Sequence, residues 1–133
     1  MSHQLTIVVY REIHAICRLE PDAPVPEWAV ASRFLSITRT ASELSIVCNE
    51  AMVPESVHAE RNQRLMQVEG TLAFALTGVL ASIAAPLATA GIGVFAVSTY
   101  DTDYFLVSNE DLLEAAQVLE AAGHAIRQNS SGD

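Results

Sequence analysis

Between Glu69 and Asp101 the chain reads Gly70-Thr-Leu-Ala-Phe-Ala-Leu-Thr-Gly-Val-Leu-Ala-Ser-Ile-Ala-Ala-Pro-Leu-Ala-Thr-Ala-Gly-Ile-Gly-Val-Phe-Ala-Val-Ser-Thr-Tyr100, without one charged side chain. Its length suggests a membrane span, but a proline and three glycines interrupt any single helix of about 20 residues. No cluster of Lys or Arg flanks the stretch, although basic flanks are what orient a span. The stretch is therefore predicted to fold as strand, loop, helix and strand.

Two local patterns support this interpretation. Apolar residues at helical spacing predict a helix with one face turned inward: Val79, Leu80, Ile83 and Leu87. The following segment, Gly91–Val97, is β-branched and aromatic, which is typical of a buried strand.

Composition excludes several classes of partner. The 133 residues carry 16 acids against seven arginines and no lysine, for a net charge of −9. Such a surface repels nucleic acids and anionic membranes, so we expect neither as a partner. Half of the residues are hydrophobic, which is enough for a packed core.

The N-terminus and the cysteines indicate a cytoplasmic protein. Met1-Ser-His-Gln lacks the basic region that opens a secretory signal peptide. Cys17 and Cys48 lie in apolar, strand-like segments. We expect both to be buried free thiols, with a disulfide or redox pair as the alternative.

The chain repeats itself when it is shifted by 60 residues. Phe34–Glu50 then lies over Val94–Glu110, so that Asn49-Glu50 meets Asn109-Glu110. Each copy reads as apolar strand, Ser/Thr-rich turn with an acid, apolar strand and helix start. Two copies of this size indicate a duplicated small domain rather than a solenoid.

The second copy predicts a complete βαββαβ unit, a ferredoxin-like arrangement. Thr77 is the expected N-cap of its first helix, and Gly91 the expected terminator. Gly123 ends the second helix. The expected elements are strand Met66–Phe74, helix to Ala90, strands Ile92–Ser98 and Tyr104–Ser108, helix Glu110–Ala122 and strand His124–Arg127.

The first copy is expected to be degenerate. Three prolines between Pro21 and Pro26 leave room for at most one helical turn in place of its first helix. Its other expected elements are strands Leu5–Tyr10 and His14–Leu19 (or one bent strand), hairpin Phe34–Cys48, a short helix Asn49–Val57 broken by Pro54, and a polar link Glu60–Arg64. The predicted division is a first unit 1–63, a second unit 64–128 and a flexible tail 129–133.

With these elements, the chain resembles the ACT-domain proteins. More narrowly, it resembles the small bacterial proteins with two ACT-like units that are related to the eukaryotic cytosolic arginine sensor. The resemblance rests on Ser36–Ser45, Leu76–Leu87 and Val97–Tyr104. It implies an α+β fold of two tandem ferredoxin-like (βαββαβ) ACT units, the first with a degenerate first helix.

The resemblance also implies a function. The protein is expected to be a non-catalytic, allosteric regulatory module without cofactor or metal. It would bind a small ligand, an amino acid or related metabolite, at an interface between ACT units, and would form a homodimer. Two alternatives remain: a regulatory subunit or relative of an amino-acid kinase, and a protein-interaction domain without a ligand.

Residues at the start of the first complete helix are candidates for binding a carboxylate. A helix N-terminus offers unpaired N–H groups and the positive end of the helix dipole, and a glycine allows close approach. The candidates are Thr77, Gly78 and Val79. The alternative is an ordinary helix start.

Acids in the next turn are candidates for binding an amino or guanidinium group. Asp101 and Asp103 lie there beside Thr99 and Tyr100. Strand alternation predicts Asp103 on the side of Thr99 if the turn is short, so Asp103 is the preferred residue of the two. The family resemblance implies Thr99, Tyr100 and Asp103 as ligand residues. The alternative is turn stabilisation by local hydrogen bonds. No third hard ligand lies nearby in sequence, so no metal is expected.

Ser36 and Ile37 occupy the matching strand of the first copy and by resemblance line the groove between units; the alternative is a core strand with a buried hydroxyl.

Gly91-Ile-Gly93 lacks the third glycine of a dinucleotide site. The four histidines show no ligand spacing and are expected at the surface. Trp28 is expected to cover the core of the first unit.

Overall fold

The computed structural model describes residues 4–70, 72–73 and 77–129. Two compact units are present: a larger unit of Met1–Arg11 with Arg64–Asp133, and a smaller unit of Glu12–Gln63. The sequence predicts 1–63 and 64–128 instead, so the difference lies in the first 11 residues. The difference arises from strand β1 (Thr6–Leu19), which is continuous. The first part of β1 pairs in parallel with β7 (Ala125–Gln128) and therefore belongs to the larger unit. Residues 130–133 of the expected tail lie outside the described residues.

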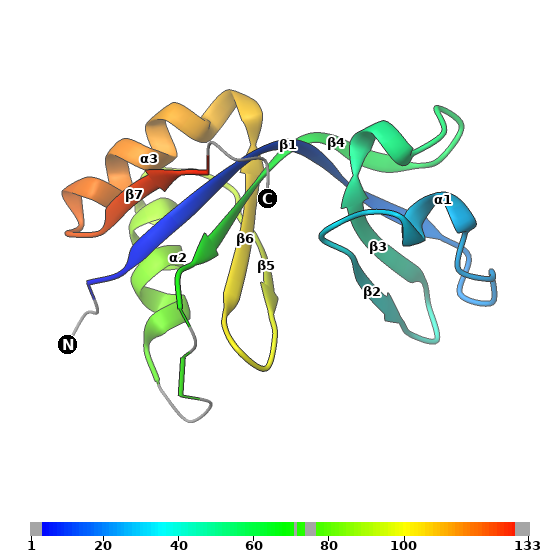
Figure 1. Cartoon of the computed structure of the whole chain (residues 1–133), viewed down its shortest axis with the longest axis horizontal. Coiled ribbons are helices and arrows are strands. Elements are labelled where there is room, and N and C mark those ends of the chain that lie inside the picture. The colour runs from blue at the N-terminus through cyan, green and yellow to red at the C-terminus, as the bar shows by residue number, and fades with distance from the viewer. Residues whose placement is uncertain (1–3, 71, 74–76, 130–133) are drawn as a thin grey trace. The chain divides into compact units, whose positions relative to one another are not determined.

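The larger unit is a mixed α/β layer structure (Figure 1). Its strand order is β7-β1-β4-β6-β5, so β1 lies between the first and last strands of a βαββαβ succession. The elements, besides β1 and β7, are β4 (Ala59–Val68), α2 (Val79–Thr89), β5 (Phe95–Ser98), β6 (Asp103–Ser108), the 3-10 turn η2 (Asn109–Asp111) and α3 (Leu112–Ala121).

Helices α2 and α3 cover one face of this sheet (Figure 1). Alternate strand residues point to that face: Ile7 and Val9 from β1, and Phe105 and Val107 from β6, are buried in one cluster. The predicted inward stripe of α2 packs on them through Val79, Ile83 and Leu87, whereas Leu80, which was expected on the same face, is exposed. Gly91, with φ of 78°, follows the end of α2 as predicted.

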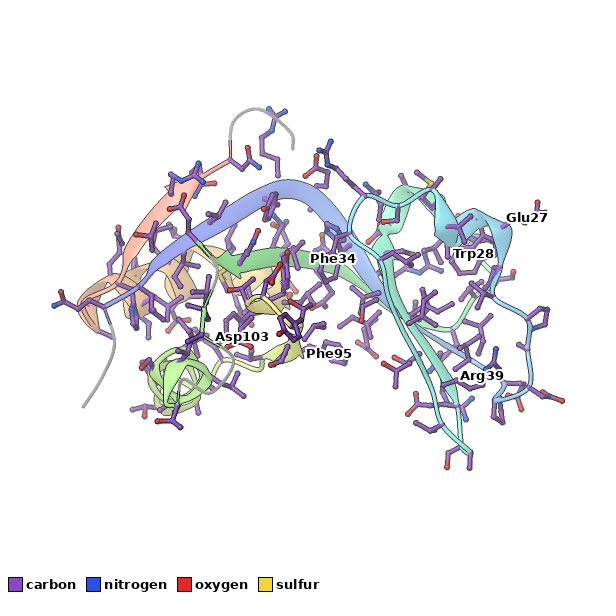
Figure 2. The ribbon with its side chains drawn as sticks, turned by 60° about the horizontal axis from the view of Figure 1, so that its bottom comes forward. Glu27, Trp28, Phe34, Arg39, Phe95 and Asp103 are labelled. Atoms are coloured by element: carbon purple, nitrogen blue, oxygen red, sulfur yellow. The ribbon has the colours of Figure 1, made fainter. Side chains whose placement is uncertain are left out.

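The smaller unit has the strand order β2-β3-β1-β4. Its elements are α1 (Glu27–Val30), β2 (Ser36–Arg39), β3 (Leu44–Asn49) and the 3-10 turn η1 (Glu50–Met52). The prolines reduce the first helix to α1, as predicted. Trp28 packs over the core, also as predicted, and Arg39 donates to the carbonyls of Pro21 and Ala23, which holds the proline segment beside β2 (Figure 2).

Both cysteines are free and buried in this smaller core. The register of β1 and β3 pairs Cys17 with Ile46 and Ala15 with Cys48, so the thiols are diagonal neighbours on one face. A hydrogen bond between them lowers the pKa of Cys17 and raises that of Cys48, and burial raises the pKa of Cys48 further.

Several expectations are wrong in detail. Glu60–Arg64 contains the boundary between the two units, as expected of a link, but it is part of strand β4, which is a neighbour of β1 in the sheet. The N-cap of α2 is Gly78, not Thr77. Strand β5 begins only at Phe95, and it is mostly exposed rather than buried. His14 and His124 are each 4% exposed and therefore buried.

No helix within residues 4–70, 72–73 and 77–129 is long and apolar enough to cross a membrane.

Candidate ligand-binding site

A cavity of about 250 Å³ lies on the larger unit, where the β5–β6 turn, the start of α2 and the segment after β4 meet. Ligand sites for drug-sized molecules usually measure about 300–1,000 Å³, so this cavity suits a smaller molecule. Its lining residues are Leu72, Ala73, Val79, Ser98, Thr99, Tyr100, Asp101, Thr102 and Asp103.

The β5–β6 turn is held by short-range hydrogen bonds. The Thr99 N–H donates to the Thr102 carbonyl at 2.9 Å, and the Thr99 hydroxyl donates to the same carbonyl at 3.0 Å. The Thr102 N–H donates back to the Thr99 hydroxyl at 3.3 Å. Local hydrogen bonds of the two threonines therefore stabilise this turn, which is the alternative role expected for its residues.

Two longer-range bonds anchor the turn to the rest of the unit. The Thr102 hydroxyl is buried and donates to the Val68 carbonyl at 2.8 Å. The Leu72 N–H donates to the Asp101 carbonyl at 2.7 Å. Main-chain groups on both sides of the turn are thus fixed, so the side chains of Asp101 and Asp103 project from a backbone that is already ordered.

The start of α2 borders the same cavity. Gly78 is the N-cap, with φ of 85°, and supplies no side-chain cap for the first turn. Its carbonyl accepts from both the N–H and the hydroxyl of Ser82, at 2.9 and 2.8 Å. Val79, the first helical residue, lines the cavity. Uncapped N–H groups and the positive end of the helix dipole favour a carboxylate at such a place.

The charged side chains that line the cavity are both acidic, Asp101 and Asp103. Asp103 lies opposite Ser98 in the β5–β6 register. Because side chains alternate along a strand, Asp103 shares its strand face with buried Phe105, the face toward α2 (Figure 2). The expectation that Asp103 shares a side with Thr99 is wrong, because Thr99 lies opposite Thr102 in the turn.

One aromatic residue, Tyr100, lines the cavity. Tyr100 is 79% exposed at the tip of the turn. Tyr104 follows Asp103 on the opposite strand face, where burial raises its pKa, with smaller contributions from Tyr10 and Asp101.

The cavity brings together four of the eight predicted ligand residues: Val79, Thr99, Tyr100 and Asp103. Thr77 and Gly78 directly precede Val79 in the chain. Ser36 and Ile37 lie on β2 of the smaller unit, and their role stays a prediction. The cavity also includes four residues that were not predicted: Leu72, Ala73, Ser98 and Thr102. Thr102 could have been chosen from the sequence, because it lies between the two candidate aspartates.

Within the described part of the chain, no group of three or more His, Cys, Asp or Glu side chains is arranged to hold a metal ion.

Sequence comparison assigns both halves of the chain. Residues 58–121 match the profile of the ACT domain, and residues 12–56 match that of a separate N-terminal domain. No curated protein sequence matches significantly.

Several solved structures share the fold of most of the chain. A protein from Agobacterium tumefaciens is 37% identical over 96% of each chain, with a TM-score of 0.91. The regulatory subunit of aspartate kinase from Thermus flavus shares the fold at 11% identity, over 90% of this chain and 99% of that one, with a TM-score of 0.61. Aspartate kinase from Clostridium acetobutylicum matches at 12% identity, over 92% of this chain and 35% of that one, with a TM-score of 0.64. Residues 58–121 thus match the ACT domain, and the chain belongs to the same family as the Agobacterium protein.

Proposed function

We propose that this protein is a non-catalytic regulatory module of the cytoplasm that binds a free amino acid in the cavity of its larger unit. The observation that carries the proposal is the meeting of two opposite chemistries in one small cavity. Val79, the first residue of α2, lines the cavity together with the carboxylate residues Asp101 and Asp103.

An α-amino acid matches both sides at once. Its carboxylate would accept from the N–H groups at the start of α2, close to Gly78, where the absence of a side chain permits approach. Its ammonium group would pair with Asp103, whose strand face is turned toward α2. Thr99 and Tyr100 would contact the ligand side chain from the rim.

The ordered turn favours binding without a large rearrangement. Bonds from Thr102 to Val68 and from Leu72 to Asp101 fix the turn before a ligand arrives. A preordered site loses less conformational entropy on binding than a mobile one. The same rigidity would carry the effect of the ligand into β5 and β6, which directly flank the turn.

A homodimer is part of the proposal, because regulation by a small ligand needs an association or a partner for it to change. The shared fold with kinase regulatory subunits supports a second candidate, a regulatory chain that acts beside a separate amino-acid kinase. In that case the partner would be the catalytic chain. A ligand-free interaction domain is the third candidate.

The decisive experiment is thermal unfolding of the purified protein in the presence of each of the twenty amino acids. A ligand at 100 times its dissociation constant adds about 2.7 kcal/mol to the free energy of unfolding, which raises the midpoint by several degrees. We expect a shift with one or a few amino acids, and its loss in Asp103→Asn. Asp22→Asn, which removes one exposed carboxylate from the smaller unit, is the matched control and should keep the shift.

Absence of a shift with every amino acid would rule out the sensor. Co-expression with an amino-acid kinase catalytic chain then separates the two other candidates, since a regulatory subunit would copurify with it.

A further inference from the structure

The two buried thiols of the smaller unit have no part in the candidate ligand site. Cys17 lies on β1 and Cys48 lies on β3, and both are free. They are diagonal neighbours in the β1–β3 register, and both belong to the core of the smaller unit. The sheet therefore holds together two sulfur atoms that are far apart along the chain.

The two thiols differ in their acidity. The hydrogen bond between them lowers the pKa of Cys17 and raises that of Cys48. Burial opposes the shift at Cys17, whereas the charge of Arg61 supports it. The thiolate therefore forms at Cys17, while Cys48 keeps its proton. A thiolate beside a second, resolving thiol is the arrangement of a redox-active cysteine pair.

Burial restricts which oxidant reaches these thiols. Cys17 is 1% exposed and Cys48 is not exposed, so a bulky disulfide reagent has no access to either sulfur. The segment between β3 and β4 packs in the same core through Val53 and Val57, and its regular structure is the short turn η1. Arg61 holds this segment by hydrogen bonds to two of its carbonyls. Local opening of such a segment breaks fewer bonds than separation of the strands and admits a small oxidant.

We propose that Cys17 and Cys48 form a modification site at which a hydroperoxide converts the two thiols into a disulfide. The Cys17 thiolate attacks one peroxide oxygen, the O–O bond breaks, and the leaving oxygen takes up a proton. The Cys48 sulfur then attacks the sulfenic sulfur of Cys17, and the displaced oxygen leaves as water with the Cys48 proton. The two sulfurs thus lose two electrons, and the peroxide gains them.

The disulfide alters β1, because diagonal positions are too far apart for an unstrained bond. Diagonal Cα atoms of antiparallel strands lie about 7–8 Å apart, whereas most disulfides span about 4.4–6.8 Å. Closing the bond therefore draws β1 and β3 together locally. Strand β1 belongs to both units, so oxidation in the smaller unit changes a strand that the larger unit also uses. Strained disulfides are readily reduced, which makes the modification reversible.

Peptide mapping of the full chain tests the proposal. The native protein is treated with hydrogen peroxide, quenched with acid and digested without a reductant. We expect the chain mass to fall by about 2 Da and a peptide to join Cys17 to Cys48. Both thiols should then be lost to titration in urea and should return with dithiothreitol. Glutathione disulfide, which is much larger than peroxide, should leave the native protein unchanged.

Single substitutions separate the roles of the two thiols. In Cys48→Ser the sulfenic acid of Cys17 has no resolving thiol, so dimedone should trap it as an added mass. Cys17→Ser is the matched control, which should stay unlabelled over the same time because it lacks the attacking thiolate. Circular dichroism verifies that both variants are folded.

Two intact thiols after a peroxide treatment that oxidises the urea-unfolded chain would overturn the proposal, as would equal labelling of the two variants. Disulfides that form only between separate chains would also contradict it. Dilute urea gives a further test, since an oxidation rate that rises in proportion to the unfolded fraction would place the reaction in the unfolded chain and overturn the site. None of these results depends on amino-acid binding, so the proposed function is tested separately.

Discussion

The side-chain hydroxyl of Thr102 donates a 2.8 Å hydrogen bond to the main-chain carbonyl of Val68, which joins the β5–β6 turn to the end of β4. Thr102 is only 4% exposed, so water cannot readily replace this bond. One of the two longer-range bonds that hold the turn with both candidate carboxylates is therefore made by a buried hydroxyl from between them.

Thr102→Val keeps the shape of the side chain but leaves the Val68 carbonyl without this donor. An unsatisfied buried acceptor costs about 1–3 kcal/mol, so we expect the free energy of unfolding, measured in urea, to fall by that amount. Any amino-acid-induced thermal shift should also decrease. Thr102→Ser, which retains the hydroxyl, is the control. Equal stabilities for the Val and Ser variants would contradict the role of the bond.

The conformation of Gly78 at the start of α2 gives a second prediction. Its φ of 85° lies in the left-handed region, which costs a residue with a side chain about 1–2 kcal/mol. Gly78→Ala should lower the stability by about this amount and weaken ligand binding at the helix start. Gly93→Ala is the control, because no atom lies within 4 Å of an added Cβ and the φ of Gly93 is not positive. A destabilisation of the same size in both variants would argue against strain at Gly78.

Much of this architecture is predictable because it depends on local patterns. Proline placement predicts the short α1, and apolar spacing predicts the inward face of α2. The passage of β1 into both units could not be predicted, because Thr6–Val9 pairs with β7 more than 100 residues away along the chain. Pairing at that distance leaves no periodic signal in a single sequence.

In the candidate site, too, some residues can be predicted from local patterns and others only from the tertiary structure. Thr99, Tyr100 and Asp103 belong to a turn whose residue types reveal its chemistry, whereas Leu72 joins the cavity only through the tertiary bond of its N–H to Asp101. The prediction for His124 was wrong. Its polarity predicts exposure, but tertiary hydrogen bonds satisfy it in the interior.

Those bonds of His124 give a third prediction. Its Nδ1 accepts from the Leu5 N–H at 3.1 Å, and its Nε2 lies 3.0 Å from the Ser82 carbonyl and donates to it. Replacement by Phe fills the space but leaves a donor and an acceptor without this partner. We expect His124→Phe to lower the free energy of unfolding by about 1–3 kcal/mol. His58→Phe, at an exposed site, should change it little. Comparable losses in both would contradict the structural role of His124.

Burial of the two thiols gives a fourth prediction. Cys17 is 1% exposed and Cys48 is not exposed, although both are free thiols. Alkylation requires an accessible thiolate, so iodoacetamide should leave the native protein unmodified near neutral pH. Mass spectrometry should detect two added groups once urea unfolds the chain. Rapid modification of either cysteine without urea would show that the smaller unit opens readily.

The raised pKa of Tyr104 gives a fifth prediction, on how the free energy of unfolding changes at alkaline pH. Burial raises its pKa above the ordinary value of 10.0, and Tyr10 and Asp101 raise it further. The folded state therefore holds the phenolic proton more tightly than the unfolded state. This contribution is complete below about pH 10 and is lost as the pH rises toward the folded-state pKa. Urea unfolding of wild type and Tyr104→Phe from neutral pH to about pH 11 should show a steeper loss of stability in the wild type above pH 10. The two profiles should run parallel below pH 9, where the proton is bound in both states. Profiles that stay parallel throughout would show that Tyr104 ionises equally in the folded and unfolded chains.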